Sequence, residues 1–294
     1  MLSDNTKGAL LMTGSMAAFT FNDALVKLVG AEIPLFQIIA IRGLLASFLI
    51  FLLARRLNKV SFRFSRKDWG LVGLRSLSEI GATYFFLTSL MLMPIANITA
   101  VLQALPLTVT LGAAFLFREK VGWRRLLAIL VGFVGMLLIV RPGTDGFTEG
   151  SVFALLAVLF VTMRDLSTRR MSPNVPSLTV TLVAALSVTC FALIASTQIS
   201  WQPVSIEQGT MLIGAAFFIL GGYSLSVIVM RVGEVAFVSP FRYTGLIWAL
   251  ALGWIVFGDW PDQVTLLGAL LVVATGGFTL YRERIAAARI KRIN

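Results

Sequence analysis

Charged side chains inside long apolar stretches are the residues of this chain most able to do chemistry. Arg42 lies near the centre of the apolar segment 34–53, and Arg75 and Glu79 lie one helical turn apart in the segment 69–91. A charge at the centre of a membrane helix costs about 2.5–3.5 kcal/mol on insertion scales, so it usually faces a cavity or a partner. Glu79 can neutralise one arginine and leave the other free for a substrate carboxylate. The alternative is a closed salt bridge that locks the two segments together.

Two prolines, Pro106 and Pro240, also lie inside apolar segments, and Pro240 has polar neighbours. Pro240 precedes Arg242 and Tyr243 in the segment 235–257. Proline lacks the backbone N–H that a helix needs, so a carbonyl one turn earlier loses its donor. Polar side chains beside an interrupted membrane helix are typical of substrate-binding segments. We therefore expect Arg242 and Tyr243 to line a substrate cavity, with a simple packing kink at the proline as the alternative.

The second internal proline, Pro106, interrupts the segment 95–117 in a similar way. Gln103 lies about one turn before it, and Thr99 lies on the same helix face as Gln103. Asn22 is a further polar side chain inside an apolar segment. All three side chains can form hydrogen bonds. We expect them to contact the substrate or, equally, to pack between helices.

Aromatic side chains with polar tips can receive an apolar or aromatic substrate. Tyr84, Tyr223 and Trp248 lie deep in their segments, as Tyr243 does. Their polar atoms require partners when the ring is buried. We expect these residues, rather than the many phenylalanines, to contribute to a binding site.

Charged residues near segment ends form a third group. Lys27 follows Asp23 by one turn, and Arg164 directly precedes Asp165. Such residues can act as gates at opposite membrane faces. Side chains near a segment end also reach water, and there they form ordinary interfacial ion pairs. The ion-pair interpretation is favoured here.

The composition excludes most catalytic chemistry. The chain has no histidine and a single cysteine, Cys190, which excludes Ser-His and Cys-His pairs, histidine-containing metal sites and an internal disulfide. The nucleotide-binding pattern G-x-x-x-x-G-K-[ST] does not occur, so the chain itself has no ATP drive. We expect neither an enzyme nor a bound cofactor or metal. Proton coupling would depend on Glu79, Asp23 or Asp165, and facilitated diffusion is the alternative.

These residues belong to a chain that is too apolar for a water-soluble protein. Of its 294 residues, 57% are hydrophobic and 13% are charged, whereas soluble domains carry about 25% charged residues. A spanning helix needs about 20 apolar residues, and the chain supplies ten such segments. They are 8–29, 34–53, 69–91, 95–117, 121–140, 150–168, 176–197, 209–230, 235–257 and 263–281. The sequence therefore predicts an all-α, multi-pass membrane protein with ten transmembrane helices.

The positive charges outside these segments predict the orientation. With the N-terminus in the cytoplasm, nineteen Lys and Arg residues lie on the cytoplasmic side and two, Lys27 and Arg141, lie on the opposite side. Positive residues accumulate on the cytoplasmic side of membrane proteins, so both termini are predicted to be cytoplasmic. The same asymmetry accounts for the net charge of +11 without a nucleic-acid partner.

The two halves of the chain resemble each other in order. Matching residues are 142 positions apart early in each half and 140 positions apart later. They are Gly8 and Gly150, Asp23 and Asp165, Lys27 and Arg169, Pro34 and Pro176, then Ala96 and Ala236, Phe117 and Phe257, and Glu119 and Asp259. We predict two five-helix repeats, residues 1–145 and 146–294. Because five is odd, the repeats cross the membrane in opposite senses, as in many secondary transporters that bind substrate between their repeats.

Short motifs run in a fixed order along nearly the whole chain. They are Asn22-Asp23-Ala24-Leu25-Val26-Lys27, Arg42-Gly43, Met93-Pro94-Ile95-Ala96, Phe117-Arg118-Glu119, Ser239-Pro240-Phe241-Arg242-Tyr243, Trp248-Ala249 and Phe257-Gly258-Asp259-Trp260-Pro261. Together they resemble the EamA-type ten-helix carriers of the drug/metabolite transporter superfamily. Arg118 and Asp259 depart from the usual Gly and Glu of that family. The overall pattern is most similar to the YddG-type aromatic amino-acid exporters.

The resemblance implies a secondary transporter in the bacterial inner membrane that works by alternating access. Its expected activity is export of amino acids, aromatic and other neutral ones. The alternative on the same scaffold is a vitamin or cofactor carrier for riboflavin or S-adenosylmethionine, and a channel is the alternative from a different class. The expected partners are a small-molecule substrate and membrane lipid, without an obligatory protein partner.

Overall fold

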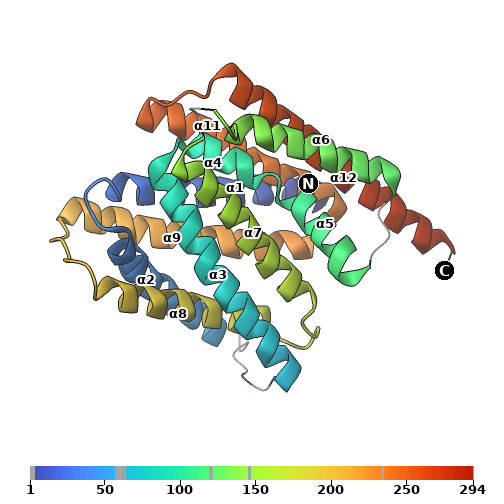
Figure 1. Ribbon diagram of the computed structural model, residues 1–294. Coiled ribbons are helices and arrows are strands. Elements are labelled where there is room, and N and C mark those ends of the chain that lie inside the picture. Colours follow the sequence, from blue (N-terminus) through green and yellow to red (C-terminus); the bar gives the residue numbers. More distant parts are fainter. Residues whose placement is uncertain are drawn as a thin grey trace.

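The computed structural model describes residues 4–56, 62, 64–118, 122–144, 147–232 and 235–293. All regular structure in these ranges is helical, as predicted (Figure 1). The predicted repeat boundary at residues 145 and 146 lies outside the described residues, as do Glu119 and several of the cytoplasmic-side cations, including Lys59, Arg63 and Lys120.

The helices coincide with the ten predicted apolar segments, and two of those segments are broken into shorter pieces. The helices are α1 (Asp4–Val29), α2 (Leu35–Arg56), α3 (Arg66–Leu92), α4 (Ile95–Leu102), α5 (Leu105–Phe117), α6 (Trp123–Val140), α7 (Glu149–Arg169), α8 (Ser177–Ser196), α9 (Ile206–Val232), α10 (Val235–Val238), the 3-10 helix η1 (Ser239–Tyr243), α11 (Thr244–Phe257) and α12 (Gln263–Ile293). The last helix continues well beyond residue 281, where the apolar segment ends.

Both broken segments are interrupted where the sequence places an internal proline. Gln103 and Ala104 form a turn between α4 and α5, and Pro106 lies in the first turn of α5. Pro240 lies in the first turn of η1, which separates α10 from α11. Proline fits the start of a helix because the N–H it lacks has no intrahelical acceptor there. Each proline therefore begins a new helical piece instead of kinking a continuous helix.

Most of the described helices are long and apolar enough to cross a membrane. Seven candidate spans meet this criterion by length and composition, and the shorter apolar helices 126–140 and 263–279 add to them. The helix α3 is not among the seven; it carries Arg75 and Glu79. This set of apolar helices is consistent with a multi-pass membrane protein.

Each helix of the first half packs chiefly against a helix of the second half. The main pairs are α1 with α9, α3 with α7, α2 with α8, α6 with α12 and α4 with α11. Figure 1 shows α6 and α12 side by side at one edge of the molecule and α2 with α8 at another. This pattern is what a duplication of five segments predicts. If each helix is replaced by its counterpart in the other half, the α1–α9 pair becomes the α7–α3 pair, and each of the other three pairs becomes itself.

Close contacts of glycine with aromatic rings hold the two largest of these pairs. A Cβ added to Gly222 of α9 would lie 2.7 Å from the ring of Phe19 in α1. A Cβ added to Gly81 of α3 would overlap the ring of Phe160 in α7 in the same way. Phe19 and Phe160 are 141 positions apart, as are Gly81 and Gly222. The same kind of contact therefore joins α1 to α9 and α7 to α3.

Candidate functional site

A buried arginine joins α1 and α2. Arg42 is 9% exposed, and its Nη1 donates a hydrogen bond to Oδ1 of Asn22 at 3.2 Å. Asn22 in turn donates from Nδ2 to Oδ1 of Asp23 at 2.9 Å. The alternative of a salt bridge that locks the segments of Arg42 and Glu79 together is wrong in its partner, because Arg42 contacts α1 and Glu79 pairs with Arg75 and Arg164. The result is a guanidinium that faces a neutral amide and one carboxylate behind it.

A second charged group joins α3 and α7. Glu79 lies 3.7 Å from Nη2 of Arg75 on its own helix and 3.3 Å from Nη1 of Arg164 on α7. Nε of Arg164 also donates to Oδ1 of Asp165 at 2.9 Å. Nε of Arg75 donates to Thr168 at 2.9 Å. The ion pairs therefore lock α3 to α7, rather than to α2.

Tyr223 of α9 connects the two groups. It interacts electrostatically with Arg42 on one side and with Glu79 and Arg164 on the other. Its ring meets Phe19 edge-on, with centroids 5.3 Å apart. Although these partners come from four helices, 36% of the Tyr223 surface stays exposed. Part of its surface is therefore accessible beside the charged groups.

We name these residues together the central polar cluster. It consists of Asn22, Asp23, Arg42, Arg75, Glu79, Arg164, Asp165 and Tyr223. Its three guanidinium groups balance three carboxylates. Sequence reasoning assigned Arg164 no role beyond its neighbour Asp165. The signal that identifies it is the repeat, because Arg164 lies 142 positions after Asn22, and both precede an aspartate.

Lys27 does not pair with Asp23 as expected. Its Nζ donates to the carbonyl oxygens of Leu90 at 2.9 Å and Met93 at 2.6 Å, at the C-terminal end of α3. The ammonium also lies 5.4 Å from the centre of the Phe257 ring. The last carbonyls of a helix lack intrahelical donors and attract cations, which explains why Lys27 turns away from the aspartate on its own helix.

The two helix breaks lie against each other. Nε2 of Gln103, in the first break, lies 3.6 Å from the position that a Cβ would take at Gly245, just after the second break. The backbone N–H of Gln103 donates to the carbonyl of Thr99 at 3.1 Å, so Thr99 is one turn away in α4. These predicted residues therefore come together where the interrupted helices meet.

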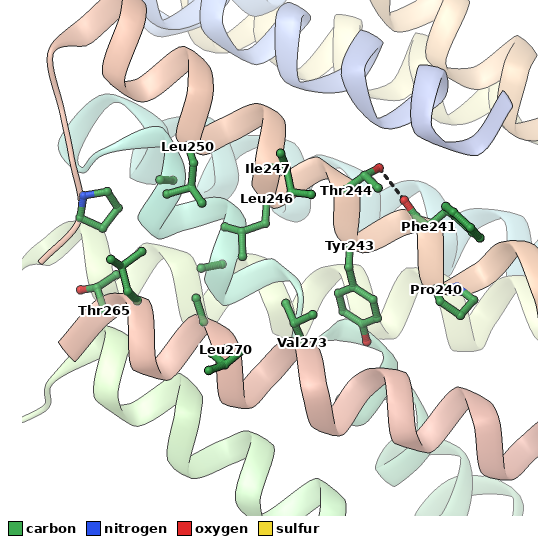
Figure 2. A pocket seen from close by; sticks show the side chains of 15 residues that line it. Pro240, Phe241, Tyr243, Thr244, Leu246, Ile247, Leu250, Thr265, Leu270 and Val273 are labelled. Atoms are coloured by element: carbon green, nitrogen blue, oxygen red, sulfur yellow. Dashed lines mark hydrogen bonds between the residues drawn. The ribbon is translucent and has the colours of Figure 1, made fainter. Parts of the chain in front are cut away.

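Arg242 and Tyr243 lie beside this junction in different environments. Arg242 is exposed. Tyr243 is 8% exposed, and its buried hydroxyl has no hydrogen-bond partner among the described residues. Figure 2 shows the Tyr243 ring extending from η1 toward α12, at the end of an apolar crevice of about 400 Å³ between α4, α11 and α12. Leu246, Leu250, Leu270 and Val273 line this crevice, so its chemistry is that of a hydrocarbon surface.

The remaining predicted aromatic residues belong to two separate groups. Tyr84 stacks on Phe36 with ring centroids 5.6 Å apart, and Phe191 of α8 meets Phe36 edge-on at 5.9 Å. Trp248 of α11 lies 6.3 Å from Phe21 of α1. Tyr84 and Trp248 therefore lie among different helices, and no ring contact joins them in the described part of the chain. That part also contains no cluster of three or more His, Cys, Asp or Glu residues suited to a metal ion.

Comparison with known proteins places this geometry among membrane transporters. The model of the EamA-like transporter family matches the chain twice, over residues 6–141 and 148–280. A solved protein structure superposes with a TM-score of 0.65 over 94% of this chain and 97% of its own, at 17% identity. That similarity concerns the fold alone.

Three curated relatives are transporters with different cargoes. The chain is 23% identical to the S-adenosylmethionine uptake transporter of Rickettsia prowazekii over 92% of this chain and 91% of that protein. It is 29% identical to the riboflavin transporter of Vibrio cholerae over 79% of this chain and 78% of that protein. It is 23% identical to the pseudopaline exporter of Pseudomonas aeruginosa over 93% of this chain and 96% of that protein.

Proposed function

Because the chain belongs to the EamA-like transporter family, we propose that it is a secondary carrier that moves a small heteroaromatic metabolite across the bacterial inner membrane by alternating access. The central polar cluster and the two helix breaks form its substrate site. Both termini lie in the cytoplasm, in line with the distribution of Lys and Arg. Residues 1–145 and 146–294 are the two repeats.

The observation that carries this proposal is the pair of helix breaks. The first break includes Gln103, and the second includes Tyr243, exactly one repeat offset of 140 positions later. Interrupted helices at equivalent positions of two inverted halves mark the substrate site in many secondary transporters. The double match of the family model and the exchange of helix pairs between halves support the same duplication. Two opposed copies of one structure give a physical route to exchange inward-facing and outward-facing states.

The substrate class follows from the relatives and from the cluster. Two of the relatives carry S-adenosylmethionine and riboflavin, which both contain a flat heteroaromatic ring system. Tyr223 and Phe19 offer an aromatic surface beside the charged groups. The balance of guanidinium groups and carboxylates suits a substrate that combines polar groups with little net charge. A vitamin or cofactor is therefore our first candidate.

Amino-acid export is the second candidate, and Arg42 is the observation in its favour. The guanidinium donates to the neutral Asn22, and Asp23 lies behind that amide. A guanidinium with donors to spare can bind a carboxylate through two parallel hydrogen bonds. An α-amino acid would supply this group, and so would S-adenosylmethionine. Riboflavin has no carboxylate and would not engage Arg42 in this way.

Counterflow into proteoliposomes tests the proposal. The vesicles are loaded with an unlabelled candidate, and uptake of the radiolabelled compound is followed for S-adenosylmethionine, riboflavin, phenylalanine and methionine. We expect transient accumulation of S-adenosylmethionine or riboflavin above the level in protein-free vesicles. Accumulation of phenylalanine or methionine alone would favour the amino-acid candidate. Absence of counterflow for all four compounds would contradict the proposed substrate classes.

A further inference from the structure

Two cation–aromatic contacts of the same kind lie at the ends of different helices. Nζ of Lys27, in the last turn of α1, lies 5.4 Å from the ring centre of Phe257, the last residue of α11. The guanidinium carbon of Arg169, the last residue of α7, lies 5.9 Å from the ring centre of Phe117, the last residue of α5. Each contact therefore ties together the C-terminal ends of two helices.

These contacts occupy equivalent positions in the two halves. Arg169 is 142 residues after Lys27, and Phe257 is 140 residues after Phe117. The cation of each contact comes from the first helix of one half, and the ring comes from the fourth apolar segment of the other half. Asp259, which follows the ring by two residues, interacts electrostatically with Lys27. Its sequence counterpart Glu119 lies outside the described residues.

The inverted duplication would place the two contacts at opposite membrane faces. A helix that begins the first half and its counterpart in an inverted second half cross the membrane in opposite directions, so their C-terminal ends emerge on different sides. The Lys27 contact then joins the halves at one face, and the Arg169 contact joins them at the other. Both are formed in this structure.

We propose that these contacts are the two latches of the transport cycle, each closing one face while the other face opens. The inference rests on the proposed alternating-access function. A cation–π contact is a modest attraction when the cation is partly hydrated, which suits a contact that has to break in every cycle. The hydrogen bonds of Lys27 to the carbonyls of Leu90 and Met93 lie within the first half, so they can hold the ammonium in place when Phe257 moves away.

The second latch has two cations, because Arg170 also lies over the Phe117 ring. The guanidinium carbon of Arg170 lies 4.7 Å from the same Phe117 ring, closer than that of Arg169. Removing Arg169 alone would therefore leave a cation on the ring. The variant that opens this latch is the double substitution Arg169→Met with Arg170→Met, whereas Lys27→Met suffices for the first.

Labelling of one cysteine from each membrane side tests the latches without any transport assay. The exposed Cys190 is first replaced by serine, and Tyr223→Cys is introduced as a reporter in the central polar cluster, where 36% of the Tyr223 surface is exposed. Counterflow is measured in the protein that retains Tyr223. An impermeant maleimide is then applied to right-side-out and inverted vesicles. We expect Lys27→Met to raise labelling about two- to fivefold from one side only. The Arg169→Met, Arg170→Met variant should raise it similarly from the other side only.

Two matched controls separate a latch from a general loss of structure. Lys27→Arg retains the cation and should label like the parent. Lys7→Met removes a cation from the opposite end of α1, where it pairs with Asp4, and should also label like the parent. Increases from the same side in both latch variants, or no increase in either, would overturn the proposal. Opposite-sided increases in a protein that shows no counterflow would keep the latches and overturn the proposed carrier function instead.

Discussion

At the scale of single residues, two arginines differ in their environment and therefore in the role that we assign to them. Arg42 is buried in the central polar cluster, whereas Arg242 is exposed on η1. We expect a bound substrate to contact Arg42 and not Arg242. The position of a cation within the fold, and not its presence in an apolar segment, therefore decides which residue we assign to the substrate.

We predict that Arg42→Gln lowers the initial rate of counterflow at least about tenfold, a loss of ~1.4 kcal/mol of transition-state stabilisation. Arg242→Gln is the matched control, because it removes the same charge from an exposed position, and its rate should stay close to that of the parent. Both variants are compared at equal amounts of reconstituted protein. The reverse order, with Arg242→Gln the inactive variant, would contradict the assignment of Arg42 to the substrate.

Glu79 is the residue on which the charges between α3 and α7 depend. Its side chain is 14% exposed and faces both Arg75 and Arg164. Glu79→Gln leaves Arg75 and Arg164 close together without the carboxylate that both contact, and removal of one partner from a largely enclosed ion pair leaves an uncompensated charge. We expect a clearly lower melting temperature in detergent. Thr168→Val, which removes one hydrogen bond from Arg75, should have a much smaller effect; equal melting temperatures for the two variants would contradict the assignment.

Asp262 gives a pH-dependent prediction outside the membrane-spanning segments. The backbone N–H of Thr265 donates to its carboxylate, and Arg141 pairs with it, so the pKa of Asp262 lies below its usual value. A depressed carboxyl pKa adds stability above the unfolded-state value of about 3.9, and this contribution is lost as pH falls through the folded value. Asp262 is half exposed, so the contribution stays below about 1 kcal/mol. Asp262→Asn should melt slightly lower than the parent at pH 7, and the difference should vanish in acid; a constant difference at all pH values would contradict this.

At the scale of the elements, close contacts at glycine residues hold together pairs of helices from opposite halves. Ser15 of α1 adds a hydrogen bond from its hydroxyl to the carbonyl of Gly222 at 2.8 Å. Phe19 covers the same glycine, so α1 and α9 approach with no room for a side chain at that position. Such close approach is how helices associate where water provides no hydrophobic driving force.

Gly222→Ala should therefore destabilise the protein by about 1–3 kcal/mol, because the added methyl group overlaps the Phe19 ring. Thermal unfolding in detergent measures the loss. Gly73→Ala is the matched control, since a Cβ there meets nothing within 4 Å, and a helical Gly→Ala change is otherwise mildly stabilising. Combining Gly222→Ala with Phe19→Leu should recover part of the loss. Equal unfolding temperatures for Gly222→Ala and Gly73→Ala would contradict the close packing.

The sequence predicts these elements better than it predicts their contacts. Apolar runs locate the helices because membrane spans need long apolar stretches, and Pro106 and Pro240 locate both breaks because proline cannot continue a helical hydrogen-bond pattern. The partner of Glu79 could not be predicted in this way. Arg164 is 85 positions distant, and only the packing of α3 on α7 brings the two together. Lys27 likewise finds the carbonyls of α3 through packing, although a local partner was available.

At the scale of the whole molecule, two similar halves meet along paired helices and share one charged centre. The proposed duplication is supported by the sequence offsets, by the two matches of the family model and by the positions of the two breaks. Two inverted copies would give two related conformations, which a carrier requires and a static pore does not. Carrier kinetics are therefore the central claim, whichever heteroaromatic or amino-acid substrate is bound.

Trans-stimulation tests that claim most directly. Proteoliposomes are loaded with the labelled compound that shows counterflow, and its efflux is timed with and without the unlabelled compound outside. A carrier returns faster with substrate bound than empty, so we predict that external substrate accelerates efflux severalfold. Efflux that is unchanged or slowed by external substrate, and that rises linearly with internal concentration, would identify a channel and contradict the account.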